Sequence, residues 1–237
     1  MKYLILSLLL IVGFITQAQT YMNIHKSDGT VVSIETSLID SITYTTIIQN
    51  GNGQNPVVNN PNPPQYNYQT VIIGNQEWMA ENLRQTHFAN GDSIINQSTA
   101  YNGDTSLVNT WGLLYDWWVT VDPRNVCPTG WHVPSLAEFD TLINFLGGDL
   151  VAGGQLKDTI LWQLPNVAAT NSLGFNALPA GYRYQNGFYN MTLHTGFWTS
   201  SDDGVNAWSK DLHYDNSQVT TGYNQKSDGL SIRCIKD

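Results

Sequence analysis

The sequence predicts a mixed α+β fold, in which irregular antiparallel strands and long loops surround at least one helix over about residues 135–146, with one disulfide. Three observations support this prediction. Short runs rich in aromatic and β-branched residues recur from residue 68 onward, separated by glycine and asparagine turns. One stretch has clear helical periodicity. Two cysteines, the full complement of the chain, lie far apart in this same region.

The first 18 residues have the pattern of a cleavable signal peptide. Met1-Lys2 supplies a positive charge, an apolar run extends from Leu4 to Ile15, and Thr16 and Ala18 are small residues placed to precede a cleavage site. The apolar run is shorter than the roughly 20 residues that a membrane helix needs. We therefore expect an exported protein that is secreted or located at the cell surface, with the periplasm as an alternative location. We expect no membrane insertion of the mature chain.

Two short segments of contrasting composition follow. Residues 19–46 alternate apolar and polar side chains on both sides of an Asp28-Gly29 turn, which predicts a small N-terminal β-hairpin unit. Residues 47–67 are rich in Asn, Gly and Pro and contain no charge. Such a segment buries too little apolar surface to offset its ordering entropy, so we expect a disordered linker there and a folded domain over 68–237.

Turn and capping residues predict the elements of this domain. Gly74-Asn75 separates two strands within residues 69–83. A capping box formed by Ser135 and Glu138 begins the helix, and Gly147-Gly148 ends it. Short strands are then expected at 175–178, 182–184, 187–189, 197–200, 207–212 and 230–235. All eight tryptophans lie in the domain, and the expected core aromatics are Trp78, Trp111, Trp117, Trp131, Phe175 and Trp198.

The cysteine pair is interpreted as a disulfide. In an oxidising compartment an isolated pair such as Cys127 and Cys234 favours a covalent bridge. Two free or metal-binding thiols are the alternative, although no histidine accompanies the pair at the spacing of a zinc site.

Several sequence blocks resemble one family, the Fibrobacter succinogenes major paralogous domain. The blocks occur in order and cover almost all of residues 69–237: IGNQEWMAENL, GLLYDW, VCPTGWHVPS, GFNALPAGYR, FWTSS and SIRCIKD, at 73–83, 112–117, 126–135, 174–183, 197–201 and 231–237. Residues 22–44 resemble a short hairpin common on exported Bacteroidetes proteins. The family resemblance implies a C-type-lectin-like fold on exported proteins of Bacteroidetes and Fibrobacteres.

No constellation of residues favours catalysis, so we expect a protein that is not an enzyme and has no catalytic residues. The formylglycine-generating relatives of this fold use a pair of active-site cysteines, whereas Cys127 and Cys234 lie in the structural blocks of the family. A disulfide also removes the thiolate that a pairing with His132 would need. Glycoside hydrolysis requires two carboxylates facing a cleft, and the spacing of the acidic residues selects no pair.

Composition restricts the partners and cofactors. The formal net charge is −9, and such an acidic chain repels phosphate backbones, so nucleic acid is not expected as a partner. No cofactor and no metal site are predicted. Calcium is the one candidate ion, because Asp202, Asp203, Asn206, Asp211, Asp215 and Asn216 supply oxygen ligands in one region. Turns and solvated loops are the alternative role for these side chains.

Ligand binding is expected on the C-terminal loops of residues 182–224. Tyrosine and tryptophan supply rigid area with a polar tip, and asparagine supplies adaptable hydrogen bonding, so such a surface suits glycans and proteins. The candidate binding residues are Tyr182, Tyr184, Asn186, Tyr189, Trp208, His213, Tyr214 and Asn216. The predicted function is recognition of a glycan or cell-surface protein. The alternatives are a structural or assembly subunit and, third, a carbohydrate-active enzyme.

Overall fold

The computed structural model describes residues 21–25, 31–35 and 66–237. The predicted signal peptide, the Asp28-Gly29 turn, and the predicted linker up to residue 65 lie outside the described residues. The chain divides into two compact units, Met1–Asn59 and Asn60–Asp237. In the first unit, β1 (Tyr21–His25) and β2 (Val31–Glu35) pair antiparallel, with Asn23 opposite Ser33.

The second unit has mixed secondary structure with several small antiparallel sheets. Its largest sheets are three-stranded, in the order β10-β11-β12, and four-stranded, in the order β3-β4-β13-β7. Two-stranded pairs are formed by β5 with β6 and by β8 with β9. The helices and strands are β3 (Thr70–Ile73), β4 (Gln76–Met79), β5 (Ser98–Thr99), α1 (Val108–Trp111), β6 (Leu114–Tyr115), β7 (Trp131–His132), α2 (Leu136–Phe145), α3 (Asp149–Leu156), β8 (Tyr182–Tyr184), β9 (Gly187–Tyr189), β10 (His194–Asp202), β11 (Asn206–His213), β12 (Val219–Gln225) and β13 (Ile235–Lys236).

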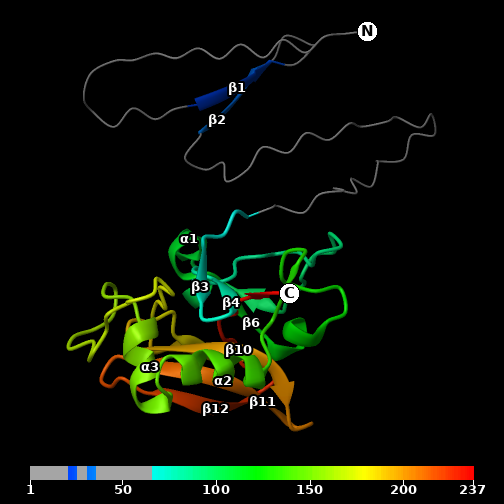
Figure 1. Ribbon diagram of the computed structural model, residues 1–237. Coiled ribbons are helices and arrows are strands. Elements are labelled where there is room, and N and C mark those ends of the chain that lie inside the picture. The colour runs from blue at the N-terminus through cyan, green and yellow to red at the C-terminus, as the bar shows by residue number, and fades with distance from the viewer. Residues whose placement is uncertain (1–20, 26–30, 36–65) are drawn as a thin grey trace, which may run out of the picture. The chain divides into compact units, whose positions relative to one another are not determined.

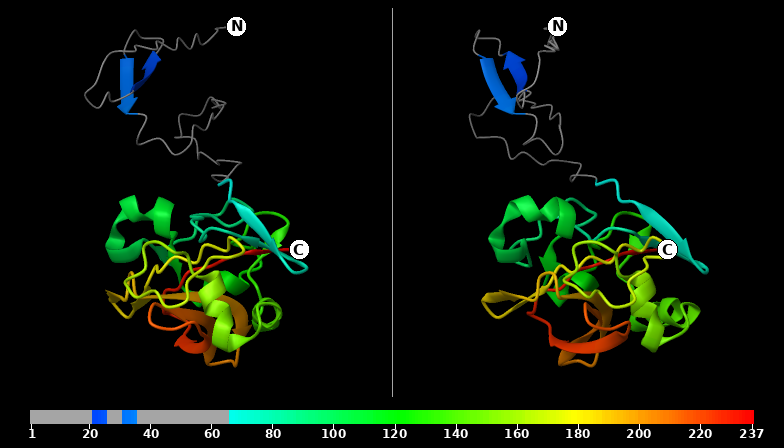
Figure 2. Two further views of the ribbon diagram at one scale, coloured as in Figure 1. Left: turned by 60° about the vertical axis from the view of Figure 1, so that its left-hand side comes forward. Right: turned by 90° about the vertical axis from the view of Figure 1, so that its left-hand side faces the viewer.

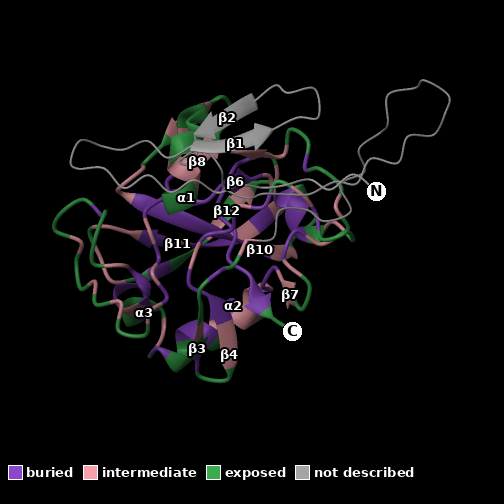
Figure 3. Ribbon diagram, turned by 90° about the horizontal axis from the view of Figure 1, so that it is seen from above, coloured by how far each residue is buried: buried purple, intermediate pink, exposed green. Residues whose placement is uncertain are grey.

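Helices α2 and α3 lie over the three-stranded sheet (Figure 1). Their apolar side chains, including Phe139, Leu142 and Leu156, form one buried cluster with Phe197 of β10 and Leu212 of β11. A second buried cluster contains Trp117, Tyr115 and Trp198. Strand β10 is mostly buried along its length, and half of the residues of β11 are buried (Figure 3). The three-stranded sheet therefore has a helix-covered face and an opposite face, and the second of these carries the site described below.

The capping box predicted for α2 is confirmed. The Ser135 hydroxyl accepts from the Glu138 backbone N–H, and the Glu138 carboxylate accepts from the Ser135 N–H at 2.8 Å. Both interactions satisfy donors that the first turn of a helix leaves open. Helix α3 was not predicted, because Gly153 and Gly154 in its sequence weaken the helical signal.

The C-terminal segment passes through the interior of the domain and is hydrogen-bonded on both sides. Ser231 exchanges backbone hydrogen bonds with β10: its N–H donates to Gly196, and its carbonyl accepts from Trp198. Further along, the Ile232 and Cys234 carbonyls accept from Leu83 and Met79. Figure 2 shows this segment, in red, crossing the domain to end beside the hairpin of β3 and β4, in cyan. The last residues therefore join the two larger sheets.

Arg233 lies at the centre of this segment with no exposed surface. Its guanidinium donates to Asn82 Oδ1 at 2.6 Å and to the Phe175 carbonyl, and it lies 4.4 Å from the centre of the Phe175 ring. Burial lowers its pKa to about 9. Because a buried charge is costly unless it is paired and hydrogen-bonded, these contacts fix the segment in one position.

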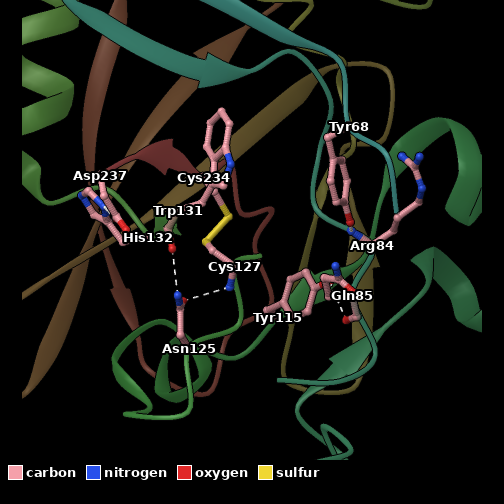
Figure 4. The surroundings of a disulfide bond; sticks show 10 residues. All are labelled: Tyr68, Arg84, Gln85, Tyr115, Asn125, Cys127, Trp131, His132, Cys234 and Asp237. Atoms are coloured by element: carbon pink, nitrogen blue, oxygen red, sulfur yellow. Dashed lines mark hydrogen bonds and ion pairs between the residues drawn. A yellow bond between two sulfur atoms is a disulfide. The ribbon is translucent and has the colours of Figure 1, made fainter. Parts of the chain in front are cut away.

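The predicted disulfide is confirmed. Cys127 and Cys234 are bonded across a sequence separation of 107, and both are fully buried. Figure 4 shows the bridge beside Asn125, whose side chain accepts from the Cys127 N–H at 3.0 Å and donates to the Trp131 carbonyl at 2.7 Å. The bond ties the loop before β7 to the terminal segment. It also removes the Cys127 thiolate, so a Cys-His nucleophile with His132 does not exist.

Some local predictions were wrong. Trp131 is only partly buried, since it packs on the edge of a core cluster with Lys236 above its ring. Residues 175–178 form a single bridge rather than a strand, because Ala177 pairs only with Lys157. Strand β12 was missed, since its residues alternate threonine, glycine and amides rather than apolar side chains. The other five of the expected core aromatics are buried.

Removing the disulfide should destabilise the domain without changing its fold. We expect Cys127→Ala/Cys234→Ala to lower the free energy of unfolding by about 2–5 kcal/mol, because a bridge across so long a loop restricts the unfolded chain. Urea denaturation of the oxidised wild type and the double variant measures this. An unchanged midpoint would show that the buried contacts of the terminal segment suffice.

Candidate functional site

An open groove lies on the face of the three-stranded sheet opposite α2 and α3. Its volume is about 600 Å³, within the range of small-ligand sites. Three tyrosines, two carboxylates, two histidines and four amides are among the groups that line it. The lining residues are Tyr182, Tyr184, Asn190, His194, Asn206, Asp211, His213, Tyr223, Asn224, Gln225, Asp228 and Leu230. We call this the tyrosine groove.

Strand alternation determines which residues of β11 reach the groove. Side chains along a strand point alternately to the two faces of a sheet. Asp211 and His213 therefore share the groove face, whereas Leu212 between them joins the helix-covered core.

The β8–β9 hairpin supplies the tyrosine wall. Arg183 exchanges both backbone hydrogen bonds with Gly229 at 2.8 Å, and its guanidinium contacts the Asp116 carboxylate and donates to the Ser227 carbonyl at 3.0 Å. Since Arg183 points to Asp116, the residues on either side of it, Tyr182 and Tyr184, face the groove. Arg183 thus anchors the hairpin to the segment that carries Asp228.

Ring stacking continues this wall onto the sheet. The Tyr182 ring stacks on Tyr189 at 5.6 Å between centroids and meets His194 edge-on at 5.5 Å. His194 in turn lies 4.8 Å from His213. Burial lowers the pKa of His194 to about 3 and also lowers that of His213, so both imidazoles are neutral at pH 7.

Asp211 forms the floor of the groove. Its side chain is 15% exposed, and its Oδ1 accepts from the Ser209 hydroxyl at 2.8 Å, while His194 Nε2 lies 3.9 Å away. Two glycines make room for the carboxyl group: a Cβ on Gly196 would lie 2.7 Å from Oδ1, and one on Gly222 would clash with Oδ2. Burial raises the pKa of Asp211 to about 6.

Asp228 brings a second carboxyl group to the groove from the start of the C-terminal segment. One oxygen accepts from the Gln225 N–H at 3.0 Å, which closes the turn after β12. Burial raises the pKa of Asp228, and the nearby Arg183 opposes this effect. Two carboxyl groups with raised pKa values therefore share one groove, an arrangement that is more frequent at functional sites than elsewhere.

A buried lysine fixes the turn that follows β11. Lys157 Nζ donates to the carbonyls of Val167, His213 and Asn216 at 2.8–3.0 Å, and burial lowers its pKa to about 8. Because three donors of the ammonium group meet three carbonyls, the backbone of His213 is held in place. The imidazole of His213 therefore projects into the groove from a rigid support.

The structure brings three of the predicted binding residues together in the groove: Tyr182, Tyr184 and His213. Tyr189 is exposed and supports Tyr182 from behind, and Asn186 is exposed in the β8–β9 turn. The other three lie elsewhere. Trp208 packs on Tyr223 at 4.9 Å, Tyr214 packs against the helix-covered cluster, and the Asn216 side chain shapes its own turn.

Several residues that line the groove were not predicted from the sequence to bind a ligand. Asp211 was considered only as a calcium or hydrolase candidate, and His194 and Asp228 were not identified as site residues. His194 follows a polar loop and starts β10, so its proximity to Asp211 depends on strand register. One sequence signal could have indicated Asp211: Gly196 lies directly opposite it and Gly222 diagonally opposite it on the neighbouring strands. This signal can be recognised only once the strand pairing is known.

Two of the proposed calcium ligands, Asp202 and Asp203, accept hydrogen bonds within the turn between β10 and β11. Asp202 Oδ1 accepts from the Gly204 N–H, and Asp203 Oδ1 accepts from the N–H groups of Val205 and Asn206. Within residues 66–237, no group of three or more His, Cys, Asp or Glu side chains is placed to hold a metal ion. In the same part of the chain, no helix has the length and apolar character to span a bilayer.

Fold and site together define a disulfide-closed α+β domain with an open groove lined by tyrosines and acids. The family profile of the Fibrobacter succinogenes major domain matches residues 71–236. The chain belongs to this family. Neither a search of curated proteins nor a search of solved structures found a significant match.

The buried carboxyl group of Asp211 should make the free energy of unfolding depend on pH. Because its folded pKa is raised, the folded state retains this proton more strongly than the unfolded state, and stability is lost as pH rises from about 4 to 6. Asp211→Asn should remove this dependence. Relative to wild type, the variant should gain roughly 2–3 kcal/mol in free energy of unfolding between pH 4 and 7.

Urea unfolding of both proteins across this pH range measures the difference. The low pKa of His194 gives an opposite trend, with stability lost on acidification, but it is present in both proteins and largely cancels. Asp149→Asn, at an exposed position on α3, is the control for the loss of one negative charge. Equal pH profiles for wild type and Asp211→Asn would contradict the burial of this carboxyl group.

Proposed function

We propose that this domain recognises a glycan in the tyrosine groove. The single observation that carries the proposal is the combination of exposed tyrosine rings with polar side chains in one groove of about 600 Å³. Sugar rings stack on aromatic faces, and their hydroxyls exchange hydrogen bonds with amides and carboxylates. A protein ligand would bury a larger and flatter surface than this groove offers.

The expected biological setting also belongs to this proposal. The signal-peptide pattern at residues 1–18 and the confirmed disulfide support export, to the cell surface or the medium. The mixed fold with small antiparallel sheets and long loops supports the C-type-lectin-like assignment implied by the sequence resemblance. A structural or assembly subunit, the first alternative, does not account for a groove that combines raised-pKa carboxyl groups with exposed rings.

Truncating the tyrosine wall should weaken glycan binding. Tyr184 and Tyr223 are 38% and 51% exposed, so replacing either with alanine removes ring area without opening the core. We expect Tyr184→Ala to lower affinity for a bound oligosaccharide roughly 2- to 12-fold, as expected for one aromatic stacking contact. The Tyr184→Ala/Tyr223→Ala variant should lose detectable binding.

A glycan array of the folded chain identifies the probe, and calorimetry on the strongest hit gives the affinities. Phe145→Ala is the matched control, because Phe145 is an exposed aromatic residue of α2, on the other side of the sheet. Binding that is unaffected by the double variant, or reduced equally by the control, would place the glycan elsewhere. An array without any hit would reject the proposed function.

Glycoside hydrolysis is the second candidate function, and one observation favours it. Asp211 and Asp228 place two carboxyl groups with raised pKa values in the same groove. Hydrolysis of a glycosidic bond uses such a pair as an acid and a base or nucleophile. We nevertheless favour binding, because Asp228 is committed to the Gln225 turn and the Asp211 carboxyl group lies in a slot between glycines.

A reducing-end assay separates the two functions. Incubation of the wild type with the oligosaccharides that it binds should release no new reducing ends above the protein-free control. If reducing ends accumulate, and if both Asp211→Asn and Asp228→Asn abolish this accumulation, the groove is an active site and the binding proposal is replaced.

A further inference from the structure

The tyrosine groove has a negative lining without a basic counterpart. Among the described residues that line it, Asp211 and Asp228 are carboxylates and none is lysine or arginine. The nearest basic groups are engaged elsewhere. Arg183 contacts Asp116, and Lys210 Nζ lies 2.7 Å from Asp140 on the helix-covered face. Arg183 and Lys210 act on Asp228 and Asp211 only at longer range, and among the described residues no lysine or arginine forms a direct ion pair with either carboxyl group.

Two buried polar groups at the floor also lack strong partners. Asp211 receives one hydrogen bond from a side chain, from the neutral Ser209 hydroxyl. His194 is 7% exposed, lines the groove, and has no partner for Nδ1 among the described residues. Buried polar atoms are normally satisfied, and a carboxylate is best satisfied by a charged donor. The Asp211 carboxyl group, whose side chain is 15% exposed, therefore leaves a place for a donor from a ligand.

The tyrosine rings suit the same kind of ligand. Tyr182, Tyr184 and Tyr223 line the groove that contains the two carboxylates. The face of an aromatic ring attracts a cation within about 6 Å, and this attraction adds to that of nearby carboxylates. Rings and acids without an intervening basic residue are the composition expected for an ammonium site.

We propose that the tyrosine groove selects an amino sugar with a free, protonated amine, whose ammonium group is bound by Asp211 and Asp228. This inference rests on the proposed glycan recognition and names its ligand class. The amine donates three hydrogen bonds, and the carboxylates supply the acceptors. An N-acetylated sugar has no charge at this position and would leave the carboxylates without a cation.

The amides favour an amino sugar over a lysine side chain. Asn190, Asn206 and Gln225 line the groove beside the acids, and each amide both donates and accepts, which matches hydroxyl groups. A lysine side chain brings a methylene stem without hydroxyls and would leave these amides with water only. Binding of a lysine-containing peptide in place of an amino sugar would therefore contradict this assignment.

Other charged groups near the acids determine how binding varies with pH. His194 and His213 face Asp211 from β10 and β11, Lys210 is its neighbour on β11, and Arg183 lies near Asp228. Burial lowers the pKa of His194 to about 3 and also lowers that of His213, so both imidazoles are neutral at pH 7 and do not compete with the ligand there. Asp211 must lose its proton to bind a cation, so acidification toward pH 4 should weaken binding.

Calorimetry with glucosamine oligomers and N-acetylglucosamine oligomers of equal length tests this inference, because the two ligands differ in the charge on nitrogen. Near pH 6, we expect the glucosamine oligomer to bind wild type at least about tenfold more tightly. Asp211→Asn and Asp228→Asn should each lower this affinity roughly ten- to a hundredfold. Asp149→Asn, which changes the net charge equally, should not.

The possible outcomes distinguish this inference from the proposed function. Equal binding of the two oligomers, with both weakened by Tyr184→Ala, would overturn amine selection and leave glycan recognition intact. Absence of binding by both oligomers while a lysine-containing peptide binds would overturn the amino-sugar ligand, whereas glycan recognition itself is rejected only by a glycan array without any hit. A further readout is specific to the floor: affinity for the glucosamine oligomer should fall more steeply from pH 6 to pH 4 in wild type and Asp228→Asn than in Asp211→Asn, in which Asp228 and His213 still titrate.

Discussion

The structure of the domain depends on the burial of its C-terminal segment. Residues 230–235 are buried without exception, and the segment is hydrogen-bonded to β10 on one side and to the β4 region on the other. The segment is also held by the disulfide from Cys234 to Cys127 and by the hydrogen bond from the Arg233 guanidinium to Asn82. Because this segment joins both larger sheets, Asp228 and Leu230 at its beginning are placed in the groove by the same contacts that complete the core.

The groove is rigid because its walls share supports with the core. Arg183 holds the tyrosine hairpin to Gly229, Lys157 holds the turn after β11, and Asp211 projects from a central strand between two glycines. Binding side chains on such supports lose little conformational entropy when a ligand arrives. This arrangement has a cost, because the Asp211 carboxyl group is partly desolvated and its charged form is disfavoured. A cationic ligand would stabilise that charged form.

The chemistry of the site is limited by what the sequence lacks as well as by what it holds. Basic residues are few, 10 against 19 acidic residues, and the arginines and lysines around the groove are paired with Asp116, Asp140 and Asp202. A groove with acids and tyrosines but no basic lining residue is one local consequence. The disulfide also uses both cysteines of the chain, which leaves no thiol for redox or nucleophilic chemistry.

Local signals in the sequence determined the helix with its capping box, the β8–β9 hairpin, the burial of most tryptophans and, through an isolated cysteine pair, the disulfide. These features depend on neighbouring residues or on simple pairing. Only the tertiary structure decided which polar side chains meet. His194, Asp211 and Asp228 belong to different segments, and their proximity follows from the strand register of β10 and β11 and from the path of the terminal segment. Tyr214 and Asn216 resembled binding residues in composition, but strand alternation and a turn directed them elsewhere.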